Sequence, residues 1–507
     1  MYIKKSRAII KGRTYEYLRL VQGIRVGTKI KHKVVAYLGR IDDPSSAASF
    51  LFNKSPVKNE QHARLYALPM ACNQIIEQVI NLPAILTKVF STSVPKETLL
   101  LIKLMILSRL LNPESKLSLT RWYQHLYLPD HLPKKIDVHQ FYTALDNLIV
   151  KKEEIEKELF IHLREQGLIG ATIVFYDLTS SYFEGEECEI AKFGHSRDKR
   201  PDCLQITIGL VIDQSGLPIF HEVFAGNMSD GKTVKGILDK VRQVLSIKNI
   251  LFVADKGMLS PDNIVELEKL TTDGYTYILS QSPRTGYDTL KSFLAQKDTW
   301  KKLTEALHYT VTAEKGGLIL CYNPFTAKKA KITRDAKIEK LTTFITLELA
   351  KTEAKRKQDK QIIHDRIIKK LHSSHAGKYF TKDTFQKKET VIRKEELLDG
   401  VWVLTGNTKL TPEEIIEAYK QEATIESSFR VIKDVVELRP IYHYNSQRVK
   451  AHVFICVLSY LVARLLERKT RQTIKTLKEK YMASVIMNGN TPSSPKQIIG
   501  GTIAMKD

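Results

Sequence analysis

Two short apolar runs, each followed directly by an aspartate, constrain the fold of this chain more than any other feature. Residues 173–176 are Ile-Val-Phe-Tyr, and residues 250–254 are Ile-Leu-Phe-Val-Ala. Continuous runs of this length are typical of strands that are buried on both faces of a sheet. Asp177 ends the first run and Asp255 ends the second. Because sites in open α/β folds lie where buried strands leave the sheet, both aspartates are candidate site residues.

The stretch around these runs predicts a mixed sheet with helices packed on it. Strands are expected at residues 204–212 and 217–224, joined by a hairpin turn at residues 213–216. A helix is expected over residues 232–245 and a further strand over residues 275–279. The order strand, hairpin, helix, strand, helix, strand indicates an α/β core.

A third carboxylate comes from a helix predicted to follow a strand at residues 401–405. Thr411 suits the helix cap, and Pro412 suits the first helical position. If one helix runs through residues 419–433, steps of three and four residues place five side chains on one face. These are Tyr419, Ala423, Glu426, Arg430 and Lys433. A solvated helix carries such charges too, so this pattern alone fits both a surface helix and a functional one.

Asp177, Asp255 and Glu426 are three hard oxygen donors on three different elements. Carboxylates that leave positions open for water and phosphate suit Mg²⁺ or Mn²⁺. Two such ions about 4 Å apart activate a nucleophile and stabilise the leaving oxygen of an in-line displacement at phosphorus. We therefore predict that these three residues are catalytic and bind Mg²⁺ or Mn²⁺. Two ions are expected.

The charge of the chain indicates its partner. The formal net charge is +23 at pH 7, which favours a polyanion, and nucleic acid is the one we expect. Residues 1–40 hold eleven lysines and arginines against Glu16 alone, so this unit is expected to contact phosphates. A basic solubilising surface and a membrane-surface protein are the alternatives.

The sequence predicts a soluble, cytoplasmic protein with no membrane contact. The most apolar run, residues 99–111, is broken by Lys103 and Arg109 and is too short to span a bilayer. The N-terminus has charge but no apolar segment of signal-peptide length. Five scattered cysteines without a C-x-x-C pair fit a reducing compartment and give no zinc site.

The changes of pattern along the chain predict its domains. The N-terminal unit shows short β-forming stretches at residues 15–20 and 33–38, and the C-terminal tail is polar and expected to be poorly ordered. The predicted domains are a basic β unit (1–45), a helical domain (60–168), the first part of the core (170–280), an inserted β-rich and helical block (281–400), the second part of the core with the catalytic helix (401–468) and a polar, basic tail (469–507).

The order Asp177, Asp255, Glu426 resembles the DDE transposases of bacterial insertion sequences, whose core is ribonuclease H-like. More narrowly, the chain resembles the branch with a β-rich insertion before the Glu and a Tyr-x₂-Arg-x₃-Glu-x₆-Lys signature on the catalytic helix. Tyr419 and Lys433 match that signature. Glu422 stands at its Arg position, so the phosphate contact made there is not carried over. Arg430 and Lys420 are the candidate replacements.

Other stretches are similar to the same branch, and together the resemblance covers about residues 170–465. They are residues 175–179, 226–230, 253–258 and 437–443. The resemblance implies metal-dependent cleavage and strand transfer at the terminal inverted repeats of an insertion sequence. The implied partners are double-stranded DNA, both terminal repeats and target, and a second copy of the chain in a homodimeric synaptic complex. The implied location is the bacterial nucleoid.

The resemblance also implies DNA contacts around the catalytic residues, by Tyr419, Arg430, Lys433, Trp402 and Lys256. Trp402 lies on the strand before the catalytic helix, where relatives that form a hairpin stack a Trp on a flipped base. A core Trp on a buried strand is the alternative. Lys256 follows the second aspartate and either contacts a phosphate or points away from the site.

Several other features admit either a DNA contact or a purely structural role. They are Arg121, Trp122, Tyr123 and His125 in the helical domain, the polar loop at residues 195–202, His452, and the basic run at residues 355–357. Two other functions remain open: a metal-dependent nuclease without strand transfer, and a catalytically idle DNA-binding protein derived from a transposon. The presence of all three carboxylates disfavours the idle protein.

Overall fold

The computed structural model describes most of the chain and divides it into two compact units. The described residues are 2–503 and 505, except 11–12, 27–28, 41–63, 92–94, 171–172, 184, 229, 246–250, 256–264, 266–267, 269–273, 313–316, 352–356, 488–496 and 500–502. Lys256 and most of the basic run at 355–357 therefore lie outside the described residues. The first unit comprises residues 1–71, 121–134 and 476–504, and the second comprises 72–120, 135–475 and 505–507.

The first unit contains two small antiparallel sheets. The N-terminal sheet consists of β1 (Tyr2–Ile10), β2 (Arg13–Val26) and β3 (Lys29–Arg40), paired in sequence order. The strands are longer than the two stretches predicted, and β1 is additional. Within this sheet Arg7 Nε donates to Glu16 Oε1 over 2.8 Å across the β1–β2 pair.

The second small sheet corrects the prediction of a poorly ordered C-terminal tail. β14 (Val485–Met487) pairs with both β15 (Gln497–Ile499) and β4 (Arg64–Leu65), after helix α17 (Ile474–Tyr481). The prediction was wrong for these residues because their order comes from main-chain pairing with a strand near the start of the chain. Such pairing leaves no periodic signal in the tail itself.

The helical region before the core packs around two apolar helices. α4 (Lys96–Leu111) contains the most apolar run of the sequence and contacts α6 (Val138–Val150) and α16 (Ser446–Thr470). α16 is the described helix long and apolar enough to cross a membrane, yet 89% of its most apolar window is buried inside the protein. That burial is what a core helix shows. The remaining elements here are α2 (Ala67–Gln74), a π-helix (Ile75–Val79), α3 (Leu82–Phe90), α5 (Lys116–Trp122), a 3₁₀ turn (Tyr123–His125) and α7 (Lys152–Glu165).

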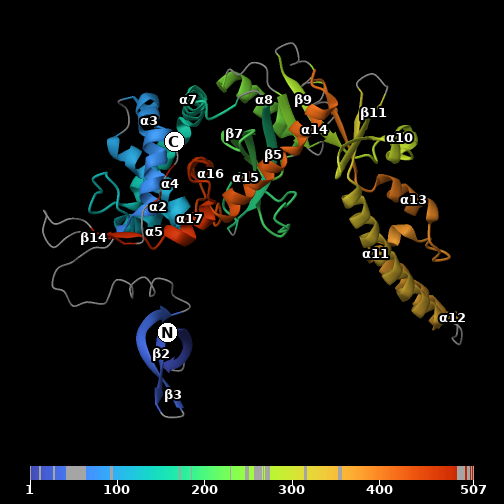
Figure 1. Ribbon diagram of the computed structural model, residues 1–507, viewed down its shortest axis with the longest axis horizontal. Helices are drawn as coiled ribbons and strands as arrows, with labels where there is room; N and C mark the ends of the chain where they lie inside the picture. Colours follow the sequence, from blue (N-terminus) through green and yellow to red (C-terminus); the bar gives the residue numbers. More distant parts are fainter. Residues whose placement is uncertain are drawn as a thin grey trace. The chain divides into compact units, whose positions relative to one another are not determined.

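A nine-stranded mixed sheet forms the centre of the second unit (Figure 1). Its strand order is β10-β11-β12-β13-β9-β8-β5-β6-β7. β5, β8 and β9 run parallel, whereas β6 and β7 form the predicted antiparallel hairpin beside β5. The core strands are β5 (Ile173–Tyr182), β6 (Gln205–Asp213), β7 (Pro218–Ala225), β8 (Leu251–Asp255), β9 (Thr276–Gln281) and β13 (Val401–Gly406), and α8 (Asp230–Leu245) is the crossover helix.

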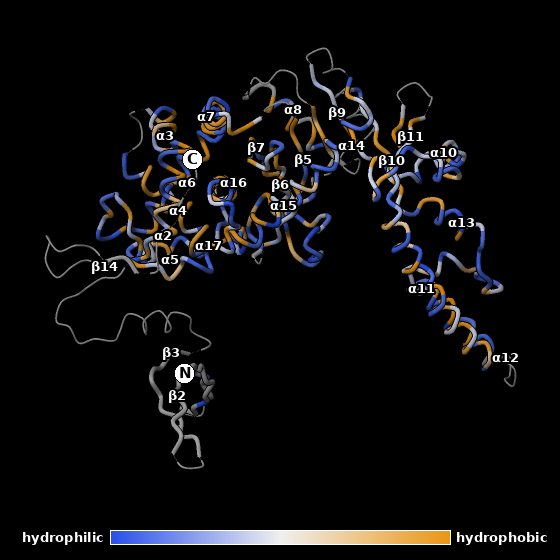
Figure 2. The backbone as a smooth tube through the Cα atoms, in the orientation of Figure 1, coloured by the Kyte–Doolittle hydropathy of each residue, from blue (hydrophilic) through white to orange (hydrophobic). Residues whose placement is uncertain are grey.

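The insertion adds three strands to this sheet and then becomes helical. β10 (Lys301–Thr304), β11 (Leu307–Val311) and β12 (Ile319–Tyr322) extend the sheet through β13, so they are not a separate β domain. Hydrophilic and hydrophobic residues alternate along α11 and α12 (Figure 2), whose apolar faces share a core around Leu341 and Ile367. The helical elements are α10 (Tyr287–Leu294), α11 (Pro324–Ala350), α12 (Lys357–Ser373), α13 (Glu389–Leu398) and 3₁₀ turns at Lys297–Thr299 and Gly377–Tyr379.

The predicted helix through residues 419–433 is two helices. α14 (Pro412–Lys420) begins at the predicted cap, where Thr411 and Glu414 form a capping box. α15 (Ala423–Asp434) follows after a turn in which the amides of Thr424 and Ile425 bond carbonyls three residues back. Bonds of that spacing tighten the helix, so Tyr419 does not keep the register with Glu426 that a continuous α-helix would give.

Candidate active site

The two aspartates occupy matching positions on neighbouring parallel strands. β5 and β8 pair at Ile173↔Leu251, Val174↔Phe252 and Phe175↔Val253. Continuing this register by two residues sets Asp177 beside Asp255, the last residue of β8. Adjacent strands lie about 4.8 Å apart, so the two backbones are close neighbours. β5 continues beyond this level, paired with β6 as far as Tyr182.

Asp177 sits on a strand whose neighbours are buried. Tyr176 and Leu178 are fully or almost fully buried, whereas Asp177 is half-buried. Its Oδ1 accepts a hydrogen bond of 2.6 Å from the amide of Leu178. The Tyr176 hydroxyl is 2.9 Å from the Thr233 hydroxyl on α8, which ties the strand to the crossover helix. Asp177 is therefore held on a rigid element and still reaches the surface.

Glu426 lies on a helix that packs directly against β5. α15 contacts both β5 and α16, and its buried face is formed by Ile425, Ser428, Phe429 and Ile432. The Tyr460 hydroxyl of α16 is 2.6 Å from the Ser428 hydroxyl and donates to the Gly216 carbonyl oxygen over 2.7 Å. Glu426 is exposed on the other side of this anchored helix. The fold thus brings the helix that carries Glu426 next to the strand that carries Asp177.

The side chain of Asp255 lies outside the described part of the chain. Among the side chains that are described, no group of three His, Cys, Asp or Glu residues is arranged to hold a metal ion.

Lys433, a predicted DNA contact, forms an ion pair with Asp198 of the loop between β5 and β6. Its Nζ lies 2.7 Å from Asp198 Oδ1, and the two side chains are only 14% and 10% exposed. Arg439 Nη1 lies 3.6 Å from the other oxygen of the same carboxylate. Arg439 also stacks over the Tyr182 ring of β5, 4.1 Å from its centroid. Arg430, by contrast, is exposed on the face of α15.

Sequence reasoning missed Asp198 as a partner of α15. From the sequence, the loop at residues 195–202 fits either a solvated surface or a DNA contact. Asp198 is instead nearly buried, and the Arg197 amide donates to the Ser180 hydroxyl of β5 over 2.8 Å. The signal available in the sequence was only the presence of an acid in a basic loop, because its partner lies more than two hundred residues away.

Trp402 lies in a row of side chains that crosses the sheet beneath α14. The strand registers align Lys301, Tyr309, Cys321 and Trp402 directly opposite one another. Lys301 is 2.5 Å from Glu413 Oε1, the Tyr309 hydroxyl donates to the same carboxylate, and these contacts lower the pKa of Glu413 to about 2. Burial raises the pKa of Cys321 to about 12, against the opposing effect of Lys420. Trp402 is half-buried, and its Nε1 has no hydrogen-bond partner within the described structure.

Tyr419 and two further candidates are placed as follows. Tyr419 is half-buried at the end of α14. Tyr123 is fully buried and donates to the Pro133 carbonyl oxygen over 2.7 Å, which favours its structural role over a DNA contact. His452 is buried in α16 with its Nε2 3.0 Å from the Leu438 carbonyl oxygen, as a core histidine would be.

The neighbouring His443 is also buried, 5.8 Å from His452 between ring centroids. Burial, together with the positive charges of Lys116 and Arg448, lowers the pKa of His443 to about 3. Burial likewise lowers the pKa of His452. Both imidazoles are therefore neutral near pH 7.

Comparison with known families identifies the class of this protein. Residues 170–462, more than half of the chain, match the family model "Transposase DDE domain", and the chain belongs to that family. Residues 3–56 match the model "IS1634 family transposase, N-terminal domain". The protein is thus a DDE transposase of an insertion sequence, a DNA-transposing enzyme, as the sequence motifs predicted.

The other comparisons add little. No curated protein matches the sequence significantly. One solved structure found similar is described as "Cryo-EM structure of piggyBac transposase synaptic complex with hairpin DNA". It shares 10% identity, the match covers 84% of this chain and 82% of that one, and the TM-score is 0.37.

Proposed function

We propose that Asp177, Asp255 and Glu426 are the catalytic residues of this transposase. The observation that carries the proposal is the parallel pairing of β5 with β8 up to Phe175 and Val253, two residues before Asp177 and Asp255, with the Glu426 helix packed on β5. Three carboxylates brought together there would give hard oxygen donors without a His, Ser or Cys nucleophile.

The core of the sheet supports a ribonuclease H-like assignment. β5, β6 and β7 form an antiparallel meander, and β8 and β9 join β5 in parallel, which gives the order β7-β6-β5-β8-β9. The catalytic helix returns to β5 only after the insertion, which enters between β9 and β13. In this proposal the insertion lengthens the sheet on the side away from the β6–β7 hairpin.

The donor set fits divalent metal ions of the Mg²⁺ or Mn²⁺ type. Asp177, Asp255 and Glu426 would hold them, and two ions, when bound, would activate the attacking hydroxyl and stabilise the leaving oxygen. The protein's own contribution is rigid placement: Asp177 is fixed by its strand and Glu426 by the Ser428–Tyr460 anchor. The single-stranded and duplex DNA ends would then be positioned by basic side chains around these carboxylates.

The substrate that this assignment implies is double-stranded DNA bearing the terminal inverted repeats, with a second DNA as target. One strand is hydrolysed, and the freed 3′-hydroxyl attacks a second phosphodiester. Arg430 is an exposed cation one turn from Glu426 and is the strongest DNA contact of the predicted set, which also includes Tyr419, Trp402, Lys256 and Lys433. A homodimer that synapses two ends in the bacterial nucleoid completes the proposal.

Cleavage of a labelled terminal-repeat end with Mg²⁺ tests the assignment. Wild type should release a 3′-hydroxyl end, and Glu426→Ala and Asp255→Ala should abolish release while DNA binding persists. Glu417→Ala is the matched control, because Glu417 is an exposed carboxylate on α14. Retained cleavage in Asp255→Ala would overturn the assignment. A wild type that cleaves but never joins a pre-cut end to target DNA would be a nuclease without strand transfer.

A further inference from the structure

The strands of the insertion hold the start of α14, the helix that leads into α15. Glu413, in the first turn of α14, accepts a hydrogen bond from the Tyr309 hydroxyl of β11 and lies 2.5 Å from Lys301 Nζ of β10. Tyr309 is 5% exposed, whereas the Lys301 side chain is 67% exposed. A hydroxyl that donates to a carboxylate forms a strong hydrogen bond, while exposed ion pairs contribute little. Tyr309 is therefore the main partner of Glu413.

The strand registers place this contact near the proposed catalytic centre. The row of side chains that contains Tyr309 ends at Trp402 on β13. Leu404, two residues further along β13, pairs with Ser280 of β9, and Ser280 pairs with Asp255 of β8. Since a strand rises about 3.3 Å per residue, the row lies about 7 Å along the strands from the level of Asp255. A change in the contact between α14 and this row thus acts close to that level.

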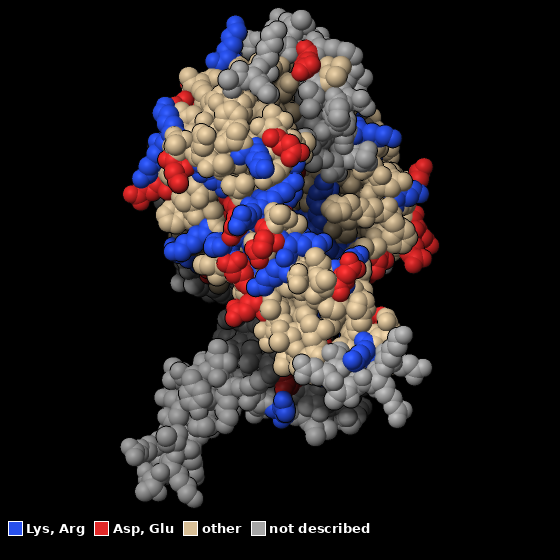
Figure 3. All heavy atoms as spheres, turned by 90° about the vertical axis from the view of Figure 1, so that its right-hand side faces the viewer, with Lys and Arg blue, Asp and Glu red and all other residues tan. Residues whose placement is uncertain are grey.

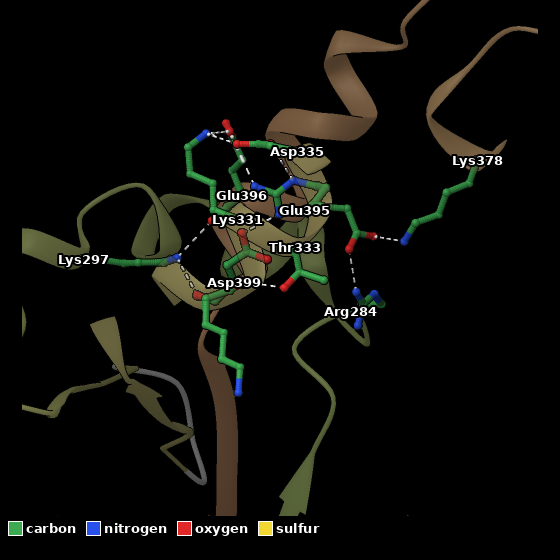
Figure 4. Close-up of polar contacts among 11 residues, drawn as sticks. Arg284, Lys297, Lys331, Thr333, Asp335, Lys378, Glu395, Glu396 and Asp399 are labelled. Atoms are coloured by element: carbon green, nitrogen blue, oxygen red, sulfur yellow. Dashed lines mark hydrogen bonds and ion pairs between the residues drawn. The ribbon is translucent and has the colours of Figure 1, made fainter. Parts of the chain in front are cut away.

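The insertion strands are fixed on the face of the sheet opposite α14. There α10 and α13 share a hydrophobic core with Leu320 and Val403, whose neighbours in sequence belong to the row beneath α14. Lys297, just before β10, donates to the carbonyl oxygens of Glu396 and Asp399 over 3.4 Å each, and Figure 4 shows it reaching the end of α13. The strands that carry the partners of Glu413 are therefore held from both sides.

Ion pairs tie the helical elements of the insertion together. Glu395 of α13 lies 2.7 Å from an Arg284 nitrogen and 3.0 Å from Lys378 Nζ, and Lys331 Nζ of α11 lies 2.8 Å from Glu396. Figure 3 shows acidic side chains interspersed with basic ones on the side of the molecule that carries the insertion. A network of such pairs holds better than one exposed pair. The insertion thus gives β10 and β11 a firm base.

A hydrogen-bonded turn carries the position of α14 to Glu426. Four amides between residues 421 and 425 bond to carbonyl oxygens three residues back, over 2.9–3.2 Å. Glu426 follows directly, in the first turn of α15. The next turn is anchored by the bond between Ser428 and Tyr460. Because this 3₁₀-like junction contains no open loop that could absorb a shift, α14 and the first turn of α15 move together.

We propose that Glu413 is a positioning residue: held by Tyr309, it fixes α14 and thereby places Glu426 for metal binding. The inference rests on the proposed catalytic role of Glu426. It gives the strands of the insertion a function in catalysis that needs no contact with the reacting atoms. Glu413 acts only through the helix pair α14 and α15.

The test uses variants of the full chain that differ in one interaction. Tyr309→Phe removes only the hydroxyl, Glu413→Ala removes the acceptor, and Glu413→Gln keeps an acceptor oxygen. The controls are Tyr322→Phe, on the neighbouring strand and the other face of the sheet, and Glu417→Ala, an exposed carboxylate on α14. We would measure hydrogen exchange of residues 423–428 without metal or DNA, affinity for terminal-repeat DNA, and cleavage at saturating DNA over a series of Mg²⁺ concentrations.

Tyr309→Phe and Glu413→Ala should each raise the Mg²⁺ concentration for half-maximal cleavage by roughly three- to tenfold, the size of coupling between contacting residues. Exchange of residues 423–428 should become faster, and DNA affinity should stay at the wild-type value. Glu413→Gln should recover part of the loss, because its amide oxygen still accepts from Tyr309. The double variant should be no worse than Glu413→Ala alone, because both changes remove the same interaction. Both controls should behave as wild type.

Three results would overturn the proposal. The first is a wild-type Mg²⁺ dependence in Tyr309→Phe and Glu413→Ala, even if their melting midpoints fall, because the contact would then serve stability alone. The second is additive losses in the double variant, which would mean that the two side chains act separately. The third is weaker DNA binding with an unchanged Mg²⁺ dependence, which would make Glu413 and Tyr309 part of a DNA-binding surface.

Hydrogen exchange separates this proposal from the catalytic assignment. Cleavage retained in Glu426→Ala would refute the proposed function, whereas exchange in the Glu413 variants is measured without metal or DNA and still reports the hold on α15. Unchanged exchange in Glu413→Ala, with Glu426→Ala inactive, would refute the positioning role alone.

Discussion

The nearly buried Asp198–Lys433 pair fastens the end of α15, and Asp198→Asn should loosen that helix. The carboxylate lies 2.7 Å from Lys433 Nζ and 3.6 Å from Arg439 Nη1, with only 10% of its side chain exposed. Removing one partner of a fully buried pair costs about 3–5 kcal/mol, whereas exposed pairs contribute about 0–1 kcal/mol. We place this variant between the two, at about 2 kcal/mol of local stability.

Hydrogen exchange of the amides in residues 423–434 of the full chain measures that loss. About 2 kcal/mol corresponds to roughly thirtyfold faster exchange, because each 1.4 kcal/mol is about tenfold. Asp202→Asn is the matched control: Asp202 lies in the same loop and pairs with Arg200 over 2.7 Å, but its side chain is 61% exposed. It should leave α15 exchange unchanged.

Two results would refute this reasoning. Unchanged exchange in Asp198→Asn would mean that the pair does not hold the helix. Equal acceleration in Asp198→Asn and Asp202→Asn would mean that loop charge matters and the ion pair does not. A double variant with Lys433→Met should exchange more slowly than Asp198→Asn alone, since it no longer leaves a nearly buried ammonium without its carboxylate.

Three further predictions follow from buried polar groups. Glu156→Gln should destabilise the second unit by about 3 kcal/mol, because the Lys152 ammonium, which is 2.8 Å away and 8% exposed, then lacks its carboxylate. The control is Glu154→Gln, which changes a surface carboxylate. A melting midpoint for Glu156→Gln no lower than that of the control would contradict this prediction. Stability should fall as the pH drops from about 6.5 towards 3, because the pKa of His443 is near 6.5 in the unfolded chain and lowered to about 3 in the folded one. In His443→Gln the melting midpoint should depend less steeply on pH over this range. An unaltered pH dependence would contradict the lowered pKa of His443. Tyr460→Phe should slow DNA cleavage while sparing DNA binding, because it removes the hydrogen bond to Ser428 that holds α15, at a cost of about 1–2 kcal/mol. A wild-type cleavage rate would show that this hydrogen bond does not position α15.

Much of the catalytic core was predictable because its signals are local. The apolar runs before Asp177 and Asp255 became β5 and β8, and the turn at residues 213–216 became the β6–β7 hairpin. Thr411 caps α14 as its position suggested. These signals need only a few neighbouring residues, since burial on both faces, turn chemistry and helix capping are short-range properties.

The insertion and the tail were less predictable because their structure depends on distant partners. β10, β11 and β12 lie in the inserted block that was predicted to be partly β-rich, but nothing in their sequences says that they join the core sheet through β13. The tail pairs with β4, from the opposite end of the chain. Strand pairing is satisfied by any main chain in the right position, so it leaves little trace in side-chain patterns.

The sequence by itself determined which residues are candidates for chemistry, and the tertiary structure decided which of them meet. Asp177, Asp255 and Glu426 were identified by their types and by the elements around them, and family membership supports the chemistry. The break between α14 and α15 and the ion pair of Lys433 with Asp198 appear only in the folded chain. The physical reason is that electrostatic pairing and burial depend on distances in space, and segments far apart in the sequence set those distances.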